Sequence, residues 1–260
     1  MTGNPEASSG TPNENNPDST VKAAEGPLAA ACEFQGLAIQ AREKCREEFR
    51  RSEREVDNNL RISVDGQIAA LVATLSRRFA KVDETISYQI GITASFARTH
   101  FIVTDLILNG DLVEAITLIR KQLESLARLH ELDSKPLEKL HGRTPNIGIL
   151  FRNGGGEFYG HLSEVAHFSK PRVAELMRVI QAGERISPSL LPEFTDHSFA
   201  CLDMNHFVAI YFLGWITEKL SEWYLDADYA GERRLFSMTL AYAEKIGVIR
   251  FPDRPNTMLN

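Results

Sequence analysis

The sequence is poor in cysteine and has no long apolar run. Its 260 residues contain 3 cysteines, Cys32, Cys45 and Cys201, and no two of them form a CxxC pair. An odd number of widely spaced cysteines does not make a disulfide framework, so we expect reduced thiols with a structural role. The longest apolar run, Phe207 to Ile216, has about half of the ~20 residues that cross a bilayer. Because the N-terminus also lacks an apolar run, we predict a soluble, cytoplasmic protein without membrane contact.

A surplus of basic residues is missing too. The chain has 29 Lys and Arg against 35 Asp and Glu, a net charge of -6. Phosphate binding needs a basic surface, so this charge argues against a protein whose main role is to wrap nucleic acid, although it leaves room for a local basic patch. The run 154–156 is three glycines, but it belongs to no GxxxxGK[ST] or GxGxxG motif after a strand. We therefore interpret it as a hinge or flap.

Strand patterns are also absent, whereas apolar residues recur at spacings of three and four. The chain is 43% hydrophobic and 25% charged, which is typical of a globular protein. We predict an all-α fold, an up-and-down bundle of about five long helices with short helices between 134 and 197. The expected helices cover 27–60, 67–108, 112–132, 157–168, 171–181, 198–225 and, after a cap at Asp226, the residues up to 247.

The domain organisation follows from shifts in composition. Residues 1–26 carry almost no large apolar side chains and are predicted to form a disordered tail. Residues 27–65 are expected to form a long charged helix that need not belong to the core, followed by a helical bundle domain at 66–249 and a loose tail at 250–260. A charged helix outside the core is compatible with a homodimer.

Four arginines recur every four residues in the charged helix, at positions 42, 46, 50 and 54. One interpretation is a ridge that contacts phosphate or RNA. The other is a solvated face whose charge is neutralised by glutamates at 43, 47, 48, 53 and 55. The interspersed acidic residues favour the ion-paired face.

One polar helix face is the strongest candidate for a functional site. Tyr159, Ser163 and His167 follow one another at intervals of four, so they share one face of a helix. Arg120 and Glu124 lie one turn apart beside the apolar seam of 112–132. Glu124 can orient Arg120, the guanidinium offers a fork to a phosphate or carboxylate, and His167 can exchange a proton near neutral pH. We take His167, Arg120 and Glu124 as candidate catalytic residues, and Tyr159 and Ser163 as candidate binding residues.

The pairing of the Arg-x3-Glu helix with the later Tyr-x3-Ser-x3-His helix resembles the bacterial DUF5677 family, which is itself similar to the helical HEPN-type domains. The resemblance covers roughly residues 90 to 225 and implies a bundle with a polar site between two helices, in a bacterial stress or phage-defence protein. It also suggests RNA or a phosphate-bearing ligand as partner. HEPN ribonucleases carry an Arg and a His four to six residues apart on one helix, and this chain lacks that spacing. A ribonuclease-like activity would have to combine His167 as acid or base with Arg120 from another helix.

Two other interpretations stay open. The same residues can form a structural network that fixes helix register, in a non-catalytic structural or protein-interaction bundle. Alternatively, Glu164-x2-His167 and Asp203-x2-His206 have the spacing of a metal-dependent bundle enzyme in which Glu124 adds a carboxylate. Because one pair has Asp in place of the usual Glu and a further ligand is missing, we expect neither a metal nor a cofactor.

The remaining histidines fall outside this face. His161 lies about 240° round the helix from His167, so it would serve a different neighbour. His100, His130, His141 and His197 have no partners at useful spacing and are expected at the surface or in loops.

Overall fold

The computed structural model describes residues 17–75, 82–150, 155–177, 179–182, 185–224 and 228–250. The chain divides into two compact units, Met1–Gln40 and Ala41–Asn260. In the first unit the described residues are all helical, and they belong to α1 (Pro17–Ser52), whose last part lies in the second unit. The second unit is a helical bundle, which confirms the all-α prediction.

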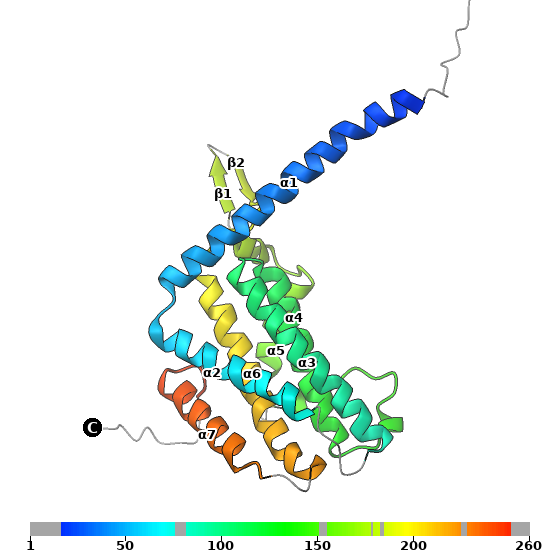
Figure 1. Cartoon of the computed structure of the whole chain (residues 1–260), viewed down its shortest axis with the longest axis vertical. Coiled ribbons are helices and arrows are strands. Elements are labelled where there is room, and N and C mark those ends of the chain that lie inside the picture. The colour runs from blue at the N-terminus through cyan, green and yellow to red at the C-terminus, as the bar shows by residue number, and fades with distance from the viewer. Residues whose placement is uncertain are drawn as a thin grey trace, which may run out of the picture. The chain divides into compact units, whose positions relative to one another are not determined.

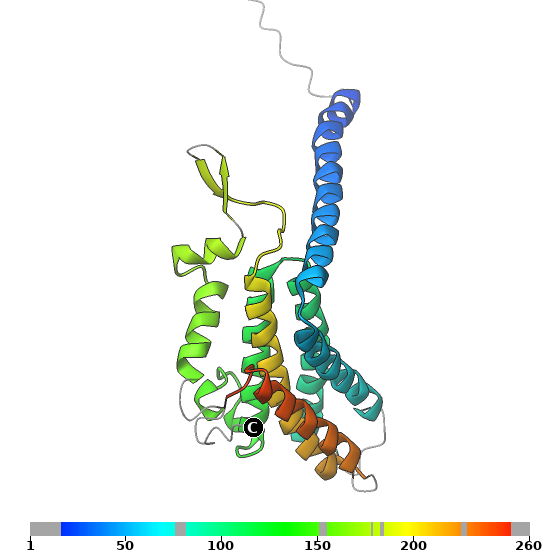
Figure 2. The same ribbon diagram turned by 90° about the vertical axis from the view of Figure 1, so that its left-hand side faces the viewer.

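The bundle is built from six further α-helices among the described residues (Figures 1 and 2). α3 and α4 form an antiparallel pair, and α4 also contacts α5 and α6. α6 runs through the middle, since it contacts α2, α3, α4 and α7. The bounds are α2 Glu55–Leu75, α3 Glu84–Leu108, α4 Leu112–Leu132, α5 Gly155–Ala166, α6 His197–Trp223 and α7 Ala230–Lys245, with single 3-10 turns η1 at Leu137–Lys139 and η2 at Ile147–Ile149.

The central position of α6 follows from apolar residues on most of its circumference. Val208, Phe212 and Ile216 are fully buried, and the Phe212 ring stacks on Phe96 of α3 at a centroid distance of 3.9 Å. Within the described ranges α6 is the one helix long and apolar enough to cross a membrane, but 61% of its most apolar window is buried in the bundle. This burial favours a core helix over a membrane span.

A tight turn at Asn109 to Asp111 reverses the chain between α3 and α4. Gly110 adopts φ +80, which disfavours any residue with a side chain, and a Cβ there would lie 3.0 Å from Glu193 O and 3.1 Å from Cys45 Sγ. The turn therefore fixes the start of α4, which begins and ends at the predicted residues and carries Arg120 and Glu124.

The break expected between the helices 27–60 and 67–108 is misplaced, and the segment expected as one helix at 67–108 belongs to two, since α2 ends at Leu75 and α3 begins at Glu84. α1 ends at Ser52, residues 53 and 54 form the link, and α2 continues through Gly66. Two ion pairs hold the link, because Arg61 donates to both carboxylate oxygens of Glu53 at 2.8 Å and Arg54 donates to Asp57 at 2.7 Å. α2 tolerates the weak helix former Gly66 because its apolar side chains are buried at helical spacing. The buried residues are Leu60, Val64, Ile68 and Leu71.

The prediction that 27–65 can lie outside the core is also wrong for its second part. Cys45 and Phe49 at the end of α1 are 3% and 0% exposed, and they belong to the second unit. Phe49 packs against Phe199 of α6 with the ring centroids 4.9 Å apart, a contact that its charged neighbours in the sequence do not predict.

The predicted ends of the domain differ as well. α1 begins at Pro17, ten residues before the predicted start at Pro27, which lies inside the helix. Proline suits the first position of a helix, and the good helix formers at 22–25 extend it from there. The tail predicted at 1–26 is therefore wrong for 17–26, which are helical, and the remaining parts of the two predicted tails, 1–16 and 251–260, lie outside the described residues.

A short β-hairpin replaces the helix predicted at 171–181. Pro171–Met177 forms a 3-10 helix, η3, and β1 (Val179–Ala182) pairs antiparallel with β2 (Arg185–Pro188), with Val179 opposite Pro188. β-branched residues favour strands, and Val179, Ile180 and Ile186 supply them here. The statement that no strand occurs was therefore wrong for this segment.

Candidate functional site

The predicted polar residues meet between α4 and α5. Arg120 and Glu124 lie one turn apart on α4, at the edge of its buried seam, so their side chains are 21% and 27% exposed. Tyr159 projects from α5, which contacts α4 along its length. The cluster is therefore half-buried and open to solvent, and it is not sealed beneath α6.

His167 lies immediately after α5 and owes its position to the way that helix ends. Ser169 N donates to Glu164 O at 3.0 Å and Phe168 N donates to Val165 O at 3.1 Å, the bonds of a Schellman motif. Phe168 adopts φ +48 in this motif, a conformation that usually falls to glycine. A strained residue thus directly follows the candidate acid or base.

Hydrogen bonds connect four side chains into one cluster. Tyr159 Oη donates to Glu124 Oε1 at 2.6 Å and accepts from Arg120 Nε and Nη2 at 3.2 and 2.9 Å. Arg120 Nε lies 3.1 Å from Glu124 Oε1, and its Nη1 lies 2.7 Å from Nε2 of His167. Glu124 and Tyr159 hold the guanidinium from one side, and His167 meets it from the other. We name these four residues the Arg120 cluster.

The roles of the atoms follow from the fact that a guanidinium can only donate. Nε2 of His167 must accept the hydrogen bond that Arg120 Nη1 donates. In this arrangement Nε2 therefore carries no hydrogen, and the ring is neutral with its hydrogen on Nδ1. Nη1 and Nη2 of Arg120 each use one hydrogen inside the cluster, and each keeps a second for another acceptor. The cluster can therefore bind an anion at Arg120 beside an unprotonated imidazole nitrogen.

Ser163 does not join the cluster. Its backbone oxygen accepts from His167 N at 3.1 Å, but its hydroxyl makes no hydrogen bond to a described residue. Because α5 ends at Ala166, His167 does not continue the helical face of Tyr159 and Ser163, but it reaches Arg120 from the turn that follows the helix.

Glu164 and His161 face a different group of residues. Glu164 accepts from Arg172 Nη2 at 2.6 Å and forms a second ion pair with Lys170. The hydrogen bonds from Lys170 and Arg172 lower the pKa of the Glu164 carboxyl, since they stabilise its charged form. Arg172 Nη2 also lies 3.3 Å from Nδ1 of His161, in agreement with the expectation that His161 serves another neighbour.

The metal interpretation finds no support in these positions. Glu164 is engaged by two cations, and within the described ranges no group of three or more His, Cys, Asp and Glu side chains could hold a metal ion. Asp203 and His206 are partly or fully buried on α6, and burial raises the pKa of Asp203 and lowers the pKa of His206 to about 3.

The prediction for His100 is wrong, because its side chain is fully buried. Its Nε2 lies 2.7 Å from Asp65 Oδ1 of α2. The signal was present in the sequence, since Phe96, His100, Val103 and Ile107 repeat at spacings of four, three and four, and all four are buried on α3. A histidine on a buried stripe of a helix belongs to the core, where its ring nitrogens require hydrogen-bond partners.

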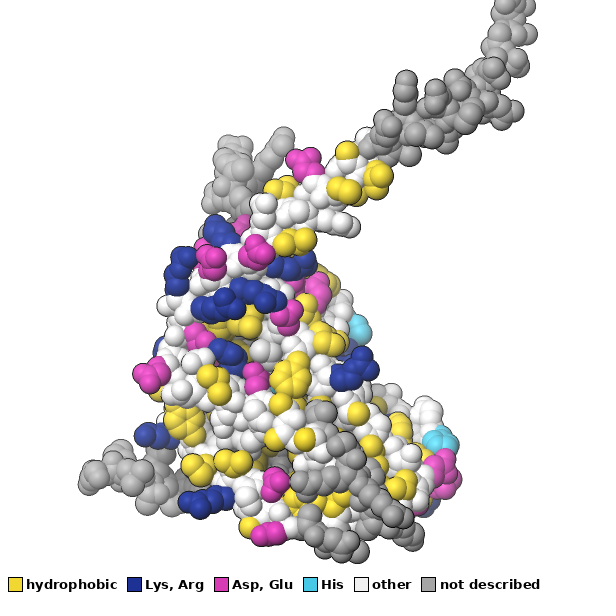
Figure 3. Space-filling view, in the orientation of Figure 1, with side chains coloured by type: hydrophobic (Ala, Val, Ile, Leu, Met, Phe, Trp, Pro, Cys, Tyr) yellow, Lys and Arg dark blue, Asp and Glu magenta, His cyan; other side chains and the backbone are white. Residues whose placement is uncertain are grey.

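Arg42, Arg46 and Arg54 of the arginine row are ion-paired, but their partners are Asp111, Asp105 and Asp57 and not the predicted glutamates. Basic and acidic side chains are mixed on the face that Figure 3 shows. The partners of Arg42 and Arg46 lie at the end of α3 and in the turn that follows it. Arg42 Nε donates to Asp111 at 2.8 Å, and Arg46 donates to Asn109 at 2.5 Å and to Asp105. These bonds hold the end of α1 to the turn and leave Arg42 and Arg46 occupied.

Comparisons with known proteins assign no family. A scan against protein-family models found no match, and searches of curated proteins and of solved structures found none. The site is thus defined by its own geometry, as a half-buried polar cluster between two helices of an all-α bundle, and the resemblance to the DUF5677 family stays a prediction.

Proposed function

We propose that the Arg120 cluster is a binding site for a phosphate group, carried by RNA or by a smaller phosphate-bearing ligand, in a cytoplasmic HEPN-like helical protein. The observation that supports this most is the 2.7 Å contact between Arg120 Nη1 and His167 Nε2 in a cluster that stays open to solvent. A guanidinium fork matches two phosphate oxygens, and Tyr159 and Glu124 hold it in place before the ligand arrives.

The charge balance sets the expected strength of this binding. Glu124 neutralises part of the charge of Arg120, so the affinity for a phosphate should be modest and should fall as the salt concentration rises. Because Arg120 engages one phosphate, binding should depend weakly on RNA sequence.

Binding can be measured by fluorescence anisotropy with a labelled single-stranded RNA of twelve nucleotides. Arg120→Ala should weaken binding by about tenfold or more, and Arg120→Lys should recover only part of it because a lysine lacks the fork. Arg98→Ala is the matched control, since it removes an exposed arginine of α3. Equal loss in the Arg120 and Arg98 variants would reduce the effect to net charge and refute the site. Competition by inorganic phosphate or a nucleotide separates a small ligand from RNA.

Cleavage of RNA is a second candidate activity, which the unprotonated Nε2 of His167 favours. Once the phosphate takes over Arg120 Nη1, Nε2 of His167 would be free to take the proton of a ribose 2′-hydroxyl as its oxygen attacks the phosphorus. The bond from phosphorus to the 5′-oxygen would break, this oxygen would take a proton from water, and a 2′,3′-cyclic phosphate would form, while Arg120 would stabilise the charge on the phosphoryl oxygens. His167→Ala and Arg120→Ala should then abolish the cleavage of RNA by the purified protein, whereas His141→Ala, which removes an exposed histidine, should not. If wild type and all variants cleave equally, the activity belongs to a contaminant.

The described part of the first unit suggests a homodimer. Residues 26–40 of α1 expose apolar side chains, among them Leu28 at 66%, Phe34 at 48% and Ile39 at 57%. We propose that two copies pair through this segment, which would remove these side chains from water. Sedimentation velocity should find a dimer for the wild type and a monomer for Phe34→Asp, and a wild-type monomer at high concentration would refute the proposal.

A further inference from the structure

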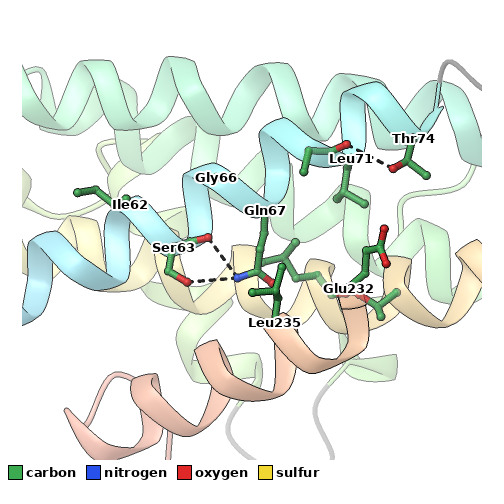
Figure 4. A pocket seen from close by; sticks show the side chains of 11 residues that line it. Ile62, Ser63, Gly66, Gln67, Leu71, Thr74, Glu232 and Leu235 are labelled. Carbon is green, nitrogen blue, oxygen red and sulfur yellow. Dashed lines mark hydrogen bonds between the residues drawn. The ribbon is translucent and has the colours of Figure 1, made fainter. Parts of the chain in front are cut away.

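A pocket lies between α2, α6 and α7, away from the Arg120 cluster on α4 and α5 (Figure 4). Its volume is about 260 Å³, just below the ~300 to 1,000 Å³ that is typical of small-molecule sites. The walls are mainly apolar and come from Ile62 and Leu71 of α2, Leu213 of α6 and Leu235 of α7. A small ligand with an apolar body would fit it.

Gln67 supplies a fixed polar group to this pocket. Its Nε2 donates to Thr239 Oγ1 at 2.6 Å and to the backbone oxygen of Ser63 at 3.1 Å. Because a backbone carbonyl can only accept, these bonds fix the orientation of the amide. The other amide atom, Oε1, is an acceptor, and no described residue donates to it.

Glu232 adds a carboxylate on the opposite side. It projects from α7 toward α2 near Thr74 (Figure 4), is half-buried, and has no ion-pair partner among the described residues. A partly buried carboxylate that no described cation neutralises favours a positively charged ligand.

Two threonine hydroxyl groups of the pocket already donate their hydrogens to backbone carbonyl oxygens. Thr74 Oγ1 donates to Ala70 O at 3.4 Å, and Thr217 Oγ1 donates to Leu213 O at 2.6 Å. Each hydroxyl keeps lone pairs only, as do Gln67 Oε1 and Glu232. Ser63 Oγ and Thr239 Oγ1 share one hydrogen bond at 2.6 Å, in which either hydroxyl can donate. Acceptors therefore predominate among the polar groups left for a ligand, which favours a ligand that donates.

We propose that this pocket binds a small organic cation, a primary amine with an apolar chain or ring. Its ammonium group pairs with the Glu232 carboxylate, its apolar body lies against the leucine and isoleucine side chains of α2, α6 and α7, and Gln67 Oε1 offers a further acceptor in the pocket. An ammonium group has three donors and no acceptor, which matches a site in which acceptors predominate. This inference is independent of the phosphate site.

Three probes of equal length and different charge test the proposal. Hexylamine, 1-hexanol and hexanoate are titrated into the full-length protein, and ¹H–¹⁵N NMR spectra are followed at Gly66, Gln67 and Leu213. Hexylamine should give saturable shifts at these residues, hexanol should bind more weakly by about tenfold or more, and hexanoate should not bind. Equal binding of all three would show an apolar cavity without charge selection and overturn the proposal, as would the absence of saturable shifts with hexylamine.

Two variants locate the site. Glu232→Gln keeps the shape of the side chain and should weaken hexylamine binding by about tenfold or more, whereas Glu218→Gln, an exposed glutamate of α6, should leave it unchanged. Gly66→Leu should block the pocket, because Gly66 lines it and a Cβ there meets no atom within 4 Å. Undiminished hexylamine binding in Glu232→Gln or in a folded Gly66→Leu would refute the assignment.

Discussion

Removal of one hydroxyl group should show how much the Arg120 cluster contributes to stability. In Tyr159→Phe, Arg120 loses the acceptor of its bonds at 3.2 and 2.9 Å, and Glu124 loses a donor at 2.6 Å. Arg120 and Glu124 still pair at 3.1 Å, so neither charge is left alone. A hydrogen bond to a charged group contributes about 1.5–3 kcal/mol, but water replaces part of it at a half-exposed site. We therefore expect the free energy of unfolding to fall by about 1–2 kcal/mol.

Urea unfolding followed by far-UV circular dichroism measures this change. Tyr88→Phe is the control, because Tyr88 is 44% exposed on α3 and has no described hydrogen-bond partner; its effect should stay within about 0.5 kcal/mol. In a double-mutant cycle with Glu124→Gln, the two changes should not add, since both act on one bond. Equal midpoints for Tyr159→Phe and wild type, or full additivity in the cycle, would refute the described hydrogen bonds.

The same measurement on His167→Ala separates a binding site from a purely structural network. His167 is exposed and lies beyond the end of α5, so its loss should cost no more than about 0.5 kcal/mol while phosphate binding or cleavage is impaired. A loss as large as that of Tyr159→Phe, with binding unchanged, would make the cluster structural.

Three further changes test other parts of the fold. Gly110→Ala should destabilise the protein by about 1–3 kcal/mol in urea unfolding, since φ +80 disfavours a side chain and Glu193 O lies 3.0 Å from the new Cβ. Gly160→Ala should instead stabilise α5 by about 0.5–1 kcal/mol, because a Cβ there meets nothing within 4 Å. Phe168→Gly should raise the free energy of unfolding by up to about 1 kcal/mol, because glycine relieves the strain at φ +48; an unchanged or lower value would contradict that strain. Burial lowers the pKa of His206 from 6.5 to about 3, so the unfolded chain takes up a proton first as the pH falls. Between those two values stability should drop by up to about 1.4 kcal/mol per pH unit, and His206→Met should lose less stability than wild type between pH 7 and pH 4.5.

The sequence predicted those parts of the structure that depend on local spacing. The bounds of α4 and the juxtaposition of Arg120 with Tyr159 and His167 followed from apolar periodicity and from intervals of four residues. In contrast, Ser163 shares the predicted interval and lies within α5, but its hydroxyl does not join the cluster, whereas His167 joins it from beyond the end of the helix at Ala166. Spacing along a helix places side chains on one face, but the partners on the neighbouring helix determine which of them make contacts.

The features that were missed depend on contacts between distant segments. The link at residues 53 and 54 is fixed by Arg61 on Glu53, and the partner of the buried His100 is Asp65 of another helix. The amine pocket combines Gln67 of α2 with Glu232 of α7, which are far apart in the sequence and belong to helices without a shared motif. The arrangement of this pocket follows from the packing of α2 and α7 against α6. Local sequence patterns do not predict how helices pack against one another.

The exposure of the Arg120 cluster favours one of its two interpretations, a ligand site or a structural network. A structural network is most useful where it is sealed, because buried polar groups that lack partners are costly and fix one arrangement of the helices. Here Arg120 and Glu124 keep more than a fifth of their side-chain surface, so water can replace their partners and the cluster adds little specificity to the fold. What its hydrogen bonds do fix is the direction of one guanidinium and the tautomer of one imidazole at the surface, with N–H groups on Nη1 and Nη2 still available. Such preorganisation lowers the entropy lost on binding, which favours a ligand site over a structural network.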